Sequence, residues 1–328
     1  MTTDFSSDIY RHADLSALKE HLKEQVDLID HYPETQPLQL EAMIAEKLGI
    51  DPEGVLLTHG TEDAVYMIAE LFRKSASIIP QPTSQEYAEA CRVHGHIISY
   101  ENTDALTELP TDRVYWICNP NNPSGNVLKK GFVDYIVRRS PRYTFVVDQS
   151  YEAYTTEPLL EPCETREIPN LLLLHSISNT YGVPGLRLGY ITAHPNTLQL
   201  LRDRRYPMSF DSMTIEAGKF LLEHGQTAIS DIEAFLAESE RLRANLRSID
   251  GLRIYETKTS FMLCELRDKT VSNLQQFLEN NYGLRVFDCS SYTGLSNYFF
   301  RVSSQQPEEN DALVDAIKAF LDDNQEKM

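Results

Sequence analysis

The sequence is poor in cysteine, in positive charge and in long hydrophobic runs, and each shortage excludes a class of protein. Its five cysteines are widely spaced and form no Cys-x-x-Cys pair, which argues against a disulfide framework or a zinc site. The 30 basic against 49 acidic residues give a net charge of −19, so DNA, RNA and anionic membranes are not expected as partners. No apolar run approaches the ~20 residues of a membrane span, and the first residues carry no targeting signal. We therefore expect a cytoplasmic protein without a membrane segment.

The signatures of two enzyme classes are also missing. The nine histidines form no His-x-x-x-His pair and no cluster with cysteine at ligand spacing, so no metal site is expected. No Gly-x-Ser-x-Gly segment occurs, which argues against a serine hydrolase. At 328 residues the chain is long enough for about two domains with substantial cores.

Short apolar runs alternate with helical patterns along the first two thirds of the chain, which predicts an α/β architecture. The runs are expected to be strands buried on both faces, and polar motifs follow their carboxyl ends, where open sheets bind ligands. Strands are predicted at 54–58, 76–80, 96–100, 114–118, 144–148 and 171–175, and helices at 15–28, 37–48 and 62–73.

The remainder of the chain predicts a smaller α+β domain. A helical region at 214–249 precedes strands at 252–255 and 260–264, a helix at 271–280, a strand at 298–302 and a closing helix from 307. We therefore divide the chain into an N-terminal arm (1–30), a large domain (31–208) and a small C-terminal domain (209–328).

Three motifs at strand ends suggest a ligand site. Gly60-Thr61-Glu62 lies between a strand and a helix, where backbone N–H groups can hold a phosphate, although taken alone the motif favours an ordinary helix cap by Thr61. The loop at 119–125, Asn-Pro-Asn-Asn-Pro-Ser-Gly, can aim an asparagine amide at a ligand oxygen or form a plain turn. Asp148 ends a buried strand and needs a cationic partner, either a protonated pyridine nitrogen or a neighbouring arginine or helix end.

The most specific motif is the segment at 176–190, which reads Ser-Ile-Ser-Asn-Thr-Tyr-Gly-Val-Pro-Gly-Leu-Arg-Leu-Gly-Tyr. It resembles the cofactor-anchoring motif of the fold-type I pyridoxal 5'-phosphate (PLP) enzymes, Ser-x-Ser-Lys-x-aromatic-Gly-x-Pro/Ala-Gly-Leu-Arg-x-Gly. In those enzymes the lysine bonds covalently to PLP. Here Asn179 stands at the lysine position.

Together these motifs resemble the class I/II aminotransferase superfamily over essentially the whole chain. The branch of histidinol-phosphate aminotransferase and threonine-phosphate decarboxylase is the most similar, through His31-Tyr32-Pro33, the 119–125 loop, the 183–190 segment and the strand at 298–302. The resemblance implies a fold-type I PLP-transferase: a large domain with a mostly parallel central sheet flanked by helices, and a smaller α+β domain. It also implies transamination or decarboxylation of an amino acid or amino acid phosphate.

The resemblance further implies roles for individual residues. Contacts to PLP are implied for Gly60, Thr61, Glu62, Ser176, Ser178 and Arg187 (phosphate), Asn122 and Tyr151 (phenolic oxygen), and Asp148 (ring nitrogen). Arg301 would clamp the carboxylate of the amino acid substrate, and Tyr32 would reach the phosphate in the neighbouring subunit of a homodimer.

Several positions depart from the family pattern. Ser84 stands where an aromatic ring usually stacks on PLP, and Tyr87 is a candidate replacement. Phe287 stands where the branch has an arginine for a substrate phosphate; Arg285, two residues earlier, is expected on the same strand face. Asp8 replaces an asparagine in the Asp-Phe-Ser-x-Asn opening of the branch.

Asn179 is the most consequential departure, because an asparagine amide forms no imine and is no base. One hypothesis is a natural enzyme from which the lysine was removed in the laboratory to trap a bound ligand. It is favoured by the otherwise intact site residues Asp148, Asn122, Tyr151, Ser178 and Arg187. A second is a natural non-catalytic sensor or partner protein that binds PLP or an aldimine. A third, that another amine serves, has no adjacent lysine to support it. We rank the third lowest, and under the first two PLP is expected to bind without the usual covalent bond and normal turnover should be nearly abolished.

Overall fold

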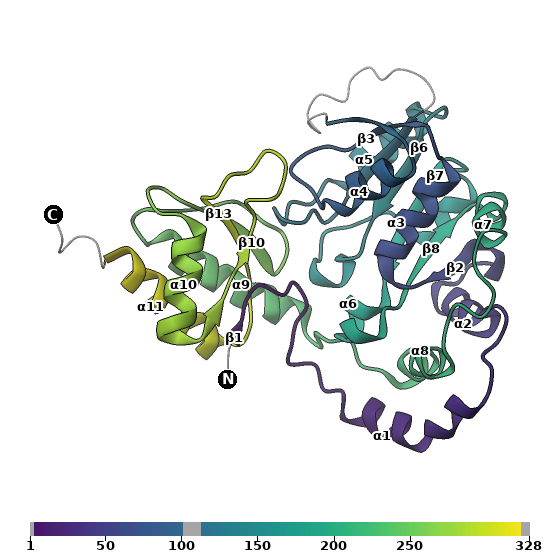
Figure 1. The fold of residues 1–328 in the computed structure, drawn as a ribbon, viewed down its shortest axis with the longest axis horizontal. Helices are drawn as coiled ribbons and strands as arrows, with labels where there is room; N and C mark the ends of the chain where they lie inside the picture. The colour runs from purple at the N-terminus through teal and green to yellow at the C-terminus, as the bar shows by residue number, and fades with distance from the viewer. Residues whose placement is uncertain (1–2, 101–112, 323–328) are drawn as a thin grey trace.

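The structure is a computed structural model that describes residues 3–100 and 113–322. Two main sheets organise these residues (Figure 1), a larger one with its helices on the right and a smaller one with α9, α10 and α11 on the left. Within the described residues, no helix combines the length and the apolar character needed to cross a membrane.

The larger sheet has seven strands and is mostly parallel, as predicted. Their order is β2 (Val55–Thr58), β8 (Gly189–Ala193), β7 (Leu171–Ser176), β6 (Thr144–Asp148), β5 (Arg113–Cys118), β3 (Ala76–Ile78) and β4 (Ile97–Ser99). Only β8 runs antiparallel to its neighbours in this sheet. All six residues of β7 are buried, because helices cover both faces of the sheet.

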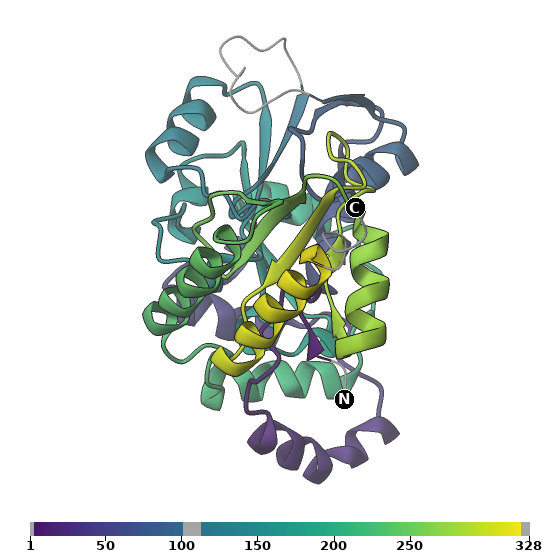
Figure 2. The same ribbon diagram turned by 90° about the vertical axis from the view of Figure 1, so that its left-hand side faces the viewer.

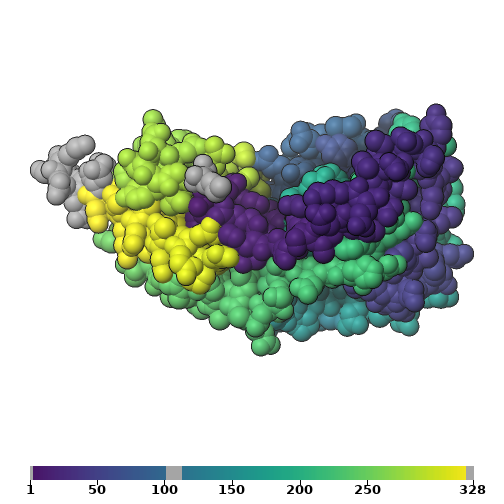
Figure 3. All heavy atoms as spheres, turned by 90° about the horizontal axis from the view of Figure 1, so that it is seen from below, coloured from purple at the N-terminus to yellow at the C-terminus, as the bar shows by residue number. Residues whose placement is uncertain are grey.

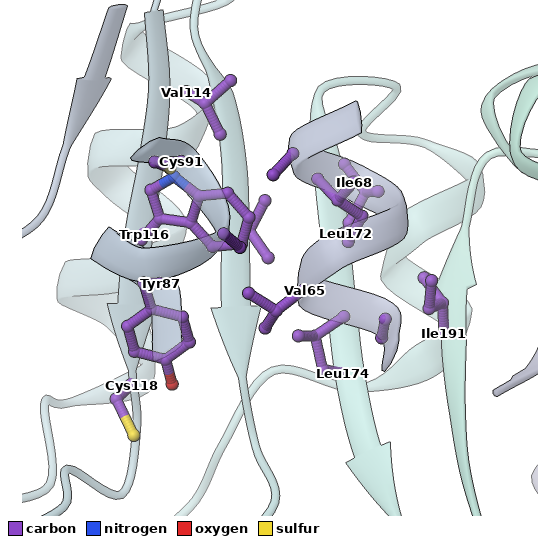
Figure 4. Close-up of a cluster of buried hydrophobic side chains, with 14 of the residues drawn as sticks. Val65, Ile68, Tyr87, Cys91, Val114, Trp116, Cys118, Leu172, Leu174 and Ile191 are labelled. Carbon is purple, nitrogen blue, oxygen red and sulfur yellow. The ribbon is translucent and has the colours of Figure 1, made fainter. Parts of the chain in front are cut away.

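Alternate residues of the central strands face different helices. Leu172 and Leu174 pack against α3 (Gly60–Leu71), beside α4 (Glu86–Val93), as Figure 4 shows for Val65 and Ile68 of α3. Leu171 and Leu173 face the opposite side, which α5 (Lys130–Arg139) covers. The remaining helices of this part are α2 (Leu38–Leu48), α6 (Ile177–Tyr181), α7 (Pro195–Arg202) and α8 (Ser212–His224).

The smaller sheet is antiparallel and carries its own core. Its order is β12 (Phe287–Asp288), β13 (Phe299–Ser303), β10 (Phe261–Leu266) and β9 (Leu252–Ile254). Met262 and Phe300 pack against α9 (Ile232–Arg247), α10 (Val271–Tyr282) and α11 (Pro307–Asp322). Figure 2 shows α10 and α11 on the outer side of this sheet, so its opposite side faces the larger sheet.

The N-terminal segment connects the two sheets. β1 (Thr3–Asp4) pairs in parallel with β11 (Leu284–Arg285), and Phe5 is buried in the core of the smaller part. From there the chain crosses to α1 (Ser16–Glu24) beside the larger part, which Figure 3 shows as the purple segment along the lower face. The predicted arm therefore begins as part of the smaller domain.

Two predicted helices are shorter than expected. The helical region at 214–249 is interrupted around Gly225, where α8 ends and α9 begins only after Asp231 accepts the N–H of Ala234 as its cap. The helix predicted at 15–28 ends at Glu24 and continues as the 3-10 helix η1 (Val26–Asp30). Strand β8 and helices α4, α5 and α7 were not predicted.

Candidate active site

A pocket of about 400 Å³ lies between the two sheets, and most of the predicted residues line it. Its floor is formed by the carboxyl ends of β5, β6 and β7 and by the first turn of α3, while β12, β13 and the N-terminal segment close its other side. The predicted residues that line it are Gly60, Thr61, Glu62, Tyr87, Asn122, Asp148, Tyr151, Ser176, Asn179, Arg187 and Arg301.

Asp148 is a buried carboxylate at the end of the central strand β6, only 7% exposed. It accepts hydrogen bonds from the Ser150 N–H (2.9 Å), the Ser150 hydroxyl and the Tyr87 hydroxyl (2.6 Å). Burial raises the pKa of Asp148, although these hydrogen bonds act in the opposite direction. No arginine, lysine or histidine of residues 3–100 and 113–322 forms an ion pair with it, so the expected cationic partner is not a neighbouring side chain.

Tyr87 reaches Asp148 from helix α4. Its ring lies against Trp116, with centroids 5.6 Å apart, and its hydroxyl points towards the carboxyl ends of the strands (Figure 4). Burial, together with the charge of Asp148, raises the pKa of Tyr87 well above its ordinary value, so the hydroxyl stays a proton donor. Whether this ring takes over the stacking role left vacant at Ser84 stays a hypothesis; Ser84 itself also lines the pocket.

An anion cradle lies at the amino end of α3. The first N–H groups of a helix have no intrahelical partners, and they carry the positive end of the helix dipole. Gly60 has a φ of +76°, and a Cβ there would lie 2.6 Å from Nη2 of Arg187. The guanidinium of Arg187 forms an ion pair with Glu62 across the same turn. Any other residue at position 60 would be strained by the positive φ, and its Cβ would displace the Arg187 guanidinium.

A hydrogen-bond network fills the opposite wall. The Asn122 amide donates to the Tyr151 hydroxyl (3.0 Å), and the Tyr151 hydroxyl donates to Oδ2 of Asp8 (2.5 Å). Arg301 donates to Oδ1 of Asn122 (2.5 Å) and to Oδ2 of Asp8 (3.1 Å). Burial, followed by the charge of Asp8, raises the pKa of Tyr151 well above its ordinary value. From the sequence, Asp8 is only a departure from the family pattern, and that pattern does not predict its contact with Arg301.

Asn179 faces the pocket from α6, directly after β7. Its backbone N–H donates to the Ser176 hydroxyl (3.1 Å), which caps the helix, and its side-chain amide donates to the carbonyl of Ser150 (3.0 Å). The Tyr154 hydroxyl donates to the Asn179 carbonyl (3.1 Å). No lysine is among the described residues that line the pocket.

Three predicted residues lie outside the pocket. Ser178 is buried, and its hydroxyl accepts the N–H of Leu188 (2.9 Å). Tyr32 is 90% exposed on the outer surface. Arg285 forms an ion pair with Glu279 (2.7 Å) and does not share a face with Phe287, because β11 and β12 belong to different sheets. The expectation that Arg285 replaces the missing arginine is therefore wrong.

Other lining residues carried no clear signal in the sequence. Ser150 follows Asp148 by two residues and fixes its carboxylate, a spacing typical of Asx turns that was overlooked. Glu86, the first residue of α4, and Tyr292, in the loop between β12 and β13, also line the pocket. The described residues contain no cluster of three or more histidine, cysteine, aspartate or glutamate side chains suited to a metal.

The pocket fits PLP in its chemistry. Asp148 is a buried carboxylate without a cationic partner among the described residues, which suits a protonated ring nitrogen, and the Gly60 turn with Arg187 suits a phosphate. Asn122 and Tyr151, which are hydrogen-bonded to each other, line the same pocket. The residues present therefore match an aromatic cation at one end and an anion at the other.

Comparisons with known proteins agree with this chemistry. The family model for aminotransferase class I and II matches residues 2–317. A histidinol-phosphate aminotransferase of Ruminiclostridium cellulolyticum is 24% identical over 318 residues, covering 92% of this chain and 87% of that protein. The crystal structure of L-threonine-O-3-phosphate decarboxylase from Porphyromonas gingivalis matches with a TM-score of 0.94 at 31% identity, covering 98% of this chain and 99% of that one.

A further solved structure carries the cofactor. Histidinol-phosphate aminotransferase from Sinorhizobium meliloti in complex with pyridoxal-5'-phosphate matches with a TM-score of 0.82 at 16% identity, covering 98% of this chain and 91% of that one. The shared architecture confirms the predicted fold class. This chain belongs to the class I and II aminotransferase family of PLP-dependent enzymes.

Proposed function

We propose that this chain binds PLP in the pocket without a covalent bond, together with an amino acid or amino acid phosphate, and that Asn179 prevents normal turnover. The observation that carries the proposal is the position of Asn179 in the pocket wall, with no lysine among the described lining residues. An amide neither forms an imine nor accepts a proton at neutral pH. Loss of a positioned general base alone slows a reaction by roughly 10²–10⁴.

The remaining site residues would hold the cofactor. The Gly60–Glu62 amides, Ser176 and Arg187 would bind the phosphate, as the cradle at the start of α3 suggests. Asp148 would keep a proton on the ring nitrogen. When bound, PLP supplies an electron-withdrawing ring that stabilises negative charge on the substrate carbon.

Contacts to the phenolic oxygen would come from the opposite wall. The amide of Asn122 already donates one hydrogen to the Tyr151 hydroxyl and keeps a second that a ligand oxygen can accept. The single hydroxyl hydrogen of Tyr151 points to Asp8 and would have to turn to the ligand. The raised pKa of Tyr151, which burial causes first, keeps its hydroxyl protonated. These two residues would therefore orient the ring rather than transfer protons.

The absorbance spectrum of the protein with added PLP tests the proposal. We expect a spectral change on binding, complete release of PLP on dialysis after borohydride treatment, and an unmodified mass for the chain. A PLP adduct on the chain would contradict the proposal, because it would require an amine other than residue 179.

Restoring lysine at position 179 is the decisive variant. Asn179→Lys should form a borohydride-reducible bond to PLP and raise turnover of O-phosphothreonine or histidinol phosphate at least ~100-fold, since the general base returns. Asn179→Gln is the matched control: it has a similar length without an amine and should gain neither property. Mass spectrometry and single-turnover spectra measure both.

A sensor or partner protein is the second candidate function. Ser84 lines the pocket where the family stacks an aromatic ring, and Phe287 lines it where the branch has an arginine. Ser84 removes a stacking contact to the PLP ring, and Phe287 removes a cation for the substrate phosphate. An active enzyme would use both contacts. An Asn179→Lys protein that bonds to PLP but turns over no substrate would favour this candidate over a single lost lysine.

We also propose a homodimer in which Tyr32 reaches the neighbouring site. Large apolar side chains around Tyr32 are exposed, namely Val26, Ile29, Leu38, Tyr206 and Met208. The two segments that carry them lie together, because the N–H of Met208 donates to the carbonyl of Thr35 (3.0 Å). An exposed apolar surface of this kind is typical of an interface between protein chains.

A further inference from the structure

The arginine expected to bind a substrate carboxylate already has a carboxylate partner within the chain. Arg301 is only 2% exposed, and its Nη1 lies 3.1 Å from Oδ2 of Asp8. The same nitrogen donates to Oδ1 of Asn122 (2.5 Å), and Nη2 donates to the carbonyl of Ser6 (2.7 Å). Three of the five N–H groups of the guanidinium are therefore engaged before any ligand arrives, while Nε is buried without a hydrogen-bond partner among the described residues.

Asp8 is fixed in this position from both sides. The carbonyl of Phe5 accepts the N–H of Ser303 (3.1 Å) next to β13, while the N–H of Tyr10 donates to the Tyr154 hydroxyl (3.1 Å) of the larger part. The hydroxyl of Tyr151 donates to the same Asp8 oxygen that contacts Arg301. The carboxylate is thus a built part of the wall and not a mobile side chain that a ligand readily displaces.

The charges around the pocket leave no free cation for an anionic substrate group. In the described lining, the cationic residues are Arg187 and Arg301, and each is paired, with Glu62 and Asp8 respectively. The side chain of Arg187 is 46% exposed, so its pair with Glu62 can give way to the cofactor phosphate, whereas the side chain of Arg301 is only 3% exposed. Burial, followed by the charge of Glu62 and Asp148, raises the pKa of the nearby Glu86.

We propose that Asp8 determines specificity by neutralising Arg301, so that the site accepts a primary amine without a carboxylate on its reacting carbon. This inference rests on the proposed binding of PLP and narrows the proposed second ligand: an amino acid carries that carboxylate and would be excluded, whereas an amine that lacks it would be accepted. A carboxylate placed near Arg301 would also lie near Asp8, and like charges in a buried site repel strongly. A neutral group there meets no such penalty and leaves the Asp8–Arg301 pair intact.

Two stable conjugates that differ only in the carboxylate test the proposal. The probes are N-(5'-phosphopyridoxyl)-L-alanine and N-(5'-phosphopyridoxyl)-ethylamine, with pyridoxamine phosphate as the reference, and calorimetry gives their affinities. We expect the chain to bind the ethylamine conjugate at least roughly 10-fold more tightly than the alanine conjugate, because only the latter brings a second negative charge to Arg301.

The variant Asp8→Asn should reverse this preference. An amide keeps an oxygen for Arg301 and Tyr151 but has no charge, so the alanine conjugate should gain roughly 10-fold or more while the ethylamine conjugate changes little. Glu53→Gln is the control: it removes one exposed negative charge beyond the other end of β2 and should leave both affinities unchanged.

The outcomes separate this inference from the proposed function. If pyridoxamine phosphate binds but the two conjugates bind the wild-type chain equally, or the alanine conjugate binds more tightly, the role of Asp8 is refuted and the cofactor site stands. If pyridoxamine phosphate itself does not bind, the cofactor proposal fails and this inference fails with it. A general loss of folding in Asp8→Asn would not mimic the expected result, because it weakens both conjugates together, and the wild-type comparison decides alone.

Discussion

At the scale of single residues, Asp148 shows the conflict between stability and ligand binding. It is buried, its carboxylate lacks a cation among the described residues, and burial raises its pKa. A folded-state pKa above the unfolded one favours folding below the unfolded pKa, and this contribution is lost as the pH rises through the folded pKa. At a pH above the unfolded pKa, the burial of Asp148 therefore destabilises the cofactor-free protein.

The variant Asp148→Asn should consequently be more stable and bind less well. In this variant the Ser150 N–H and hydroxyl can still donate to Oδ1, and the Tyr87 hydroxyl can accept a hydrogen bond from the new amide. We expect a gain of roughly 1 kcal/mol in the free energy of unfolding without cofactor at pH 7, measured by urea denaturation. The affinity for PLP should fall at least roughly 10-fold. Equal stability of both proteins across pH 4–8 would contradict the argument.

At the scale of elements, the turn from β2 into α3 is expected to hold the cofactor phosphate, and a substitution at Gly60 tests this. Gly60 has a positive φ, and a Cβ there would meet the Arg187 guanidinium at 2.6 Å. Gly60→Ala should cost about 1 kcal/mol of stability and displace Arg187 from the cradle. The affinity for PLP should fall roughly 10-fold, whereas binding of pyridoxal, which has no phosphate, should change little.

Another glycine of the chain provides the matched control. Gly131 lies in helix α5, and a Cβ there meets no atom within 4 Å. Gly131→Ala should leave PLP binding unchanged and stabilise the protein by about 0.5–1 kcal/mol. An equal loss of affinity for PLP and pyridoxal in Gly60→Ala would show that the turn does not hold the phosphate.

The same elements show what could be predicted from the sequence. β6 and β7 are continuous apolar runs, so their burial and the polar residues at their carboxyl ends followed from the pattern. Helix α4 is short and polar, and no periodicity in its sequence predicts which residue Tyr87 contacts. The contact of Tyr87 with Asp148 could therefore not be predicted. Arg285 was misplaced because two residues of one apparent strand divide between two sheets, which only tertiary pairing decides.

At the scale of the whole molecule, the exposed Tyr32 raises the question of how many chains form a site. Its side chain is 90% exposed and lines no part of the pocket in its own chain. If it reaches the phosphate in a second chain, Tyr32→Phe should weaken PLP binding roughly 10-fold without loss of stability. Tyr135→Phe, which alters another exposed tyrosine on α5, should have no effect on binding.

Mixed dimers make this prediction specific. In a dimer of one Tyr32→Phe chain and one Asp148→Asn chain, the first chain keeps Asp148 and receives an intact Tyr32 from the second. The other site of the same dimer lacks both groups. Purification through two different tags should therefore yield a dimer with about one high-affinity PLP site per two chains, because two-fold symmetry exchanges the same residues in both directions. If Tyr32 served its own chain, no site in the mixed dimer would be intact, and titration would find none.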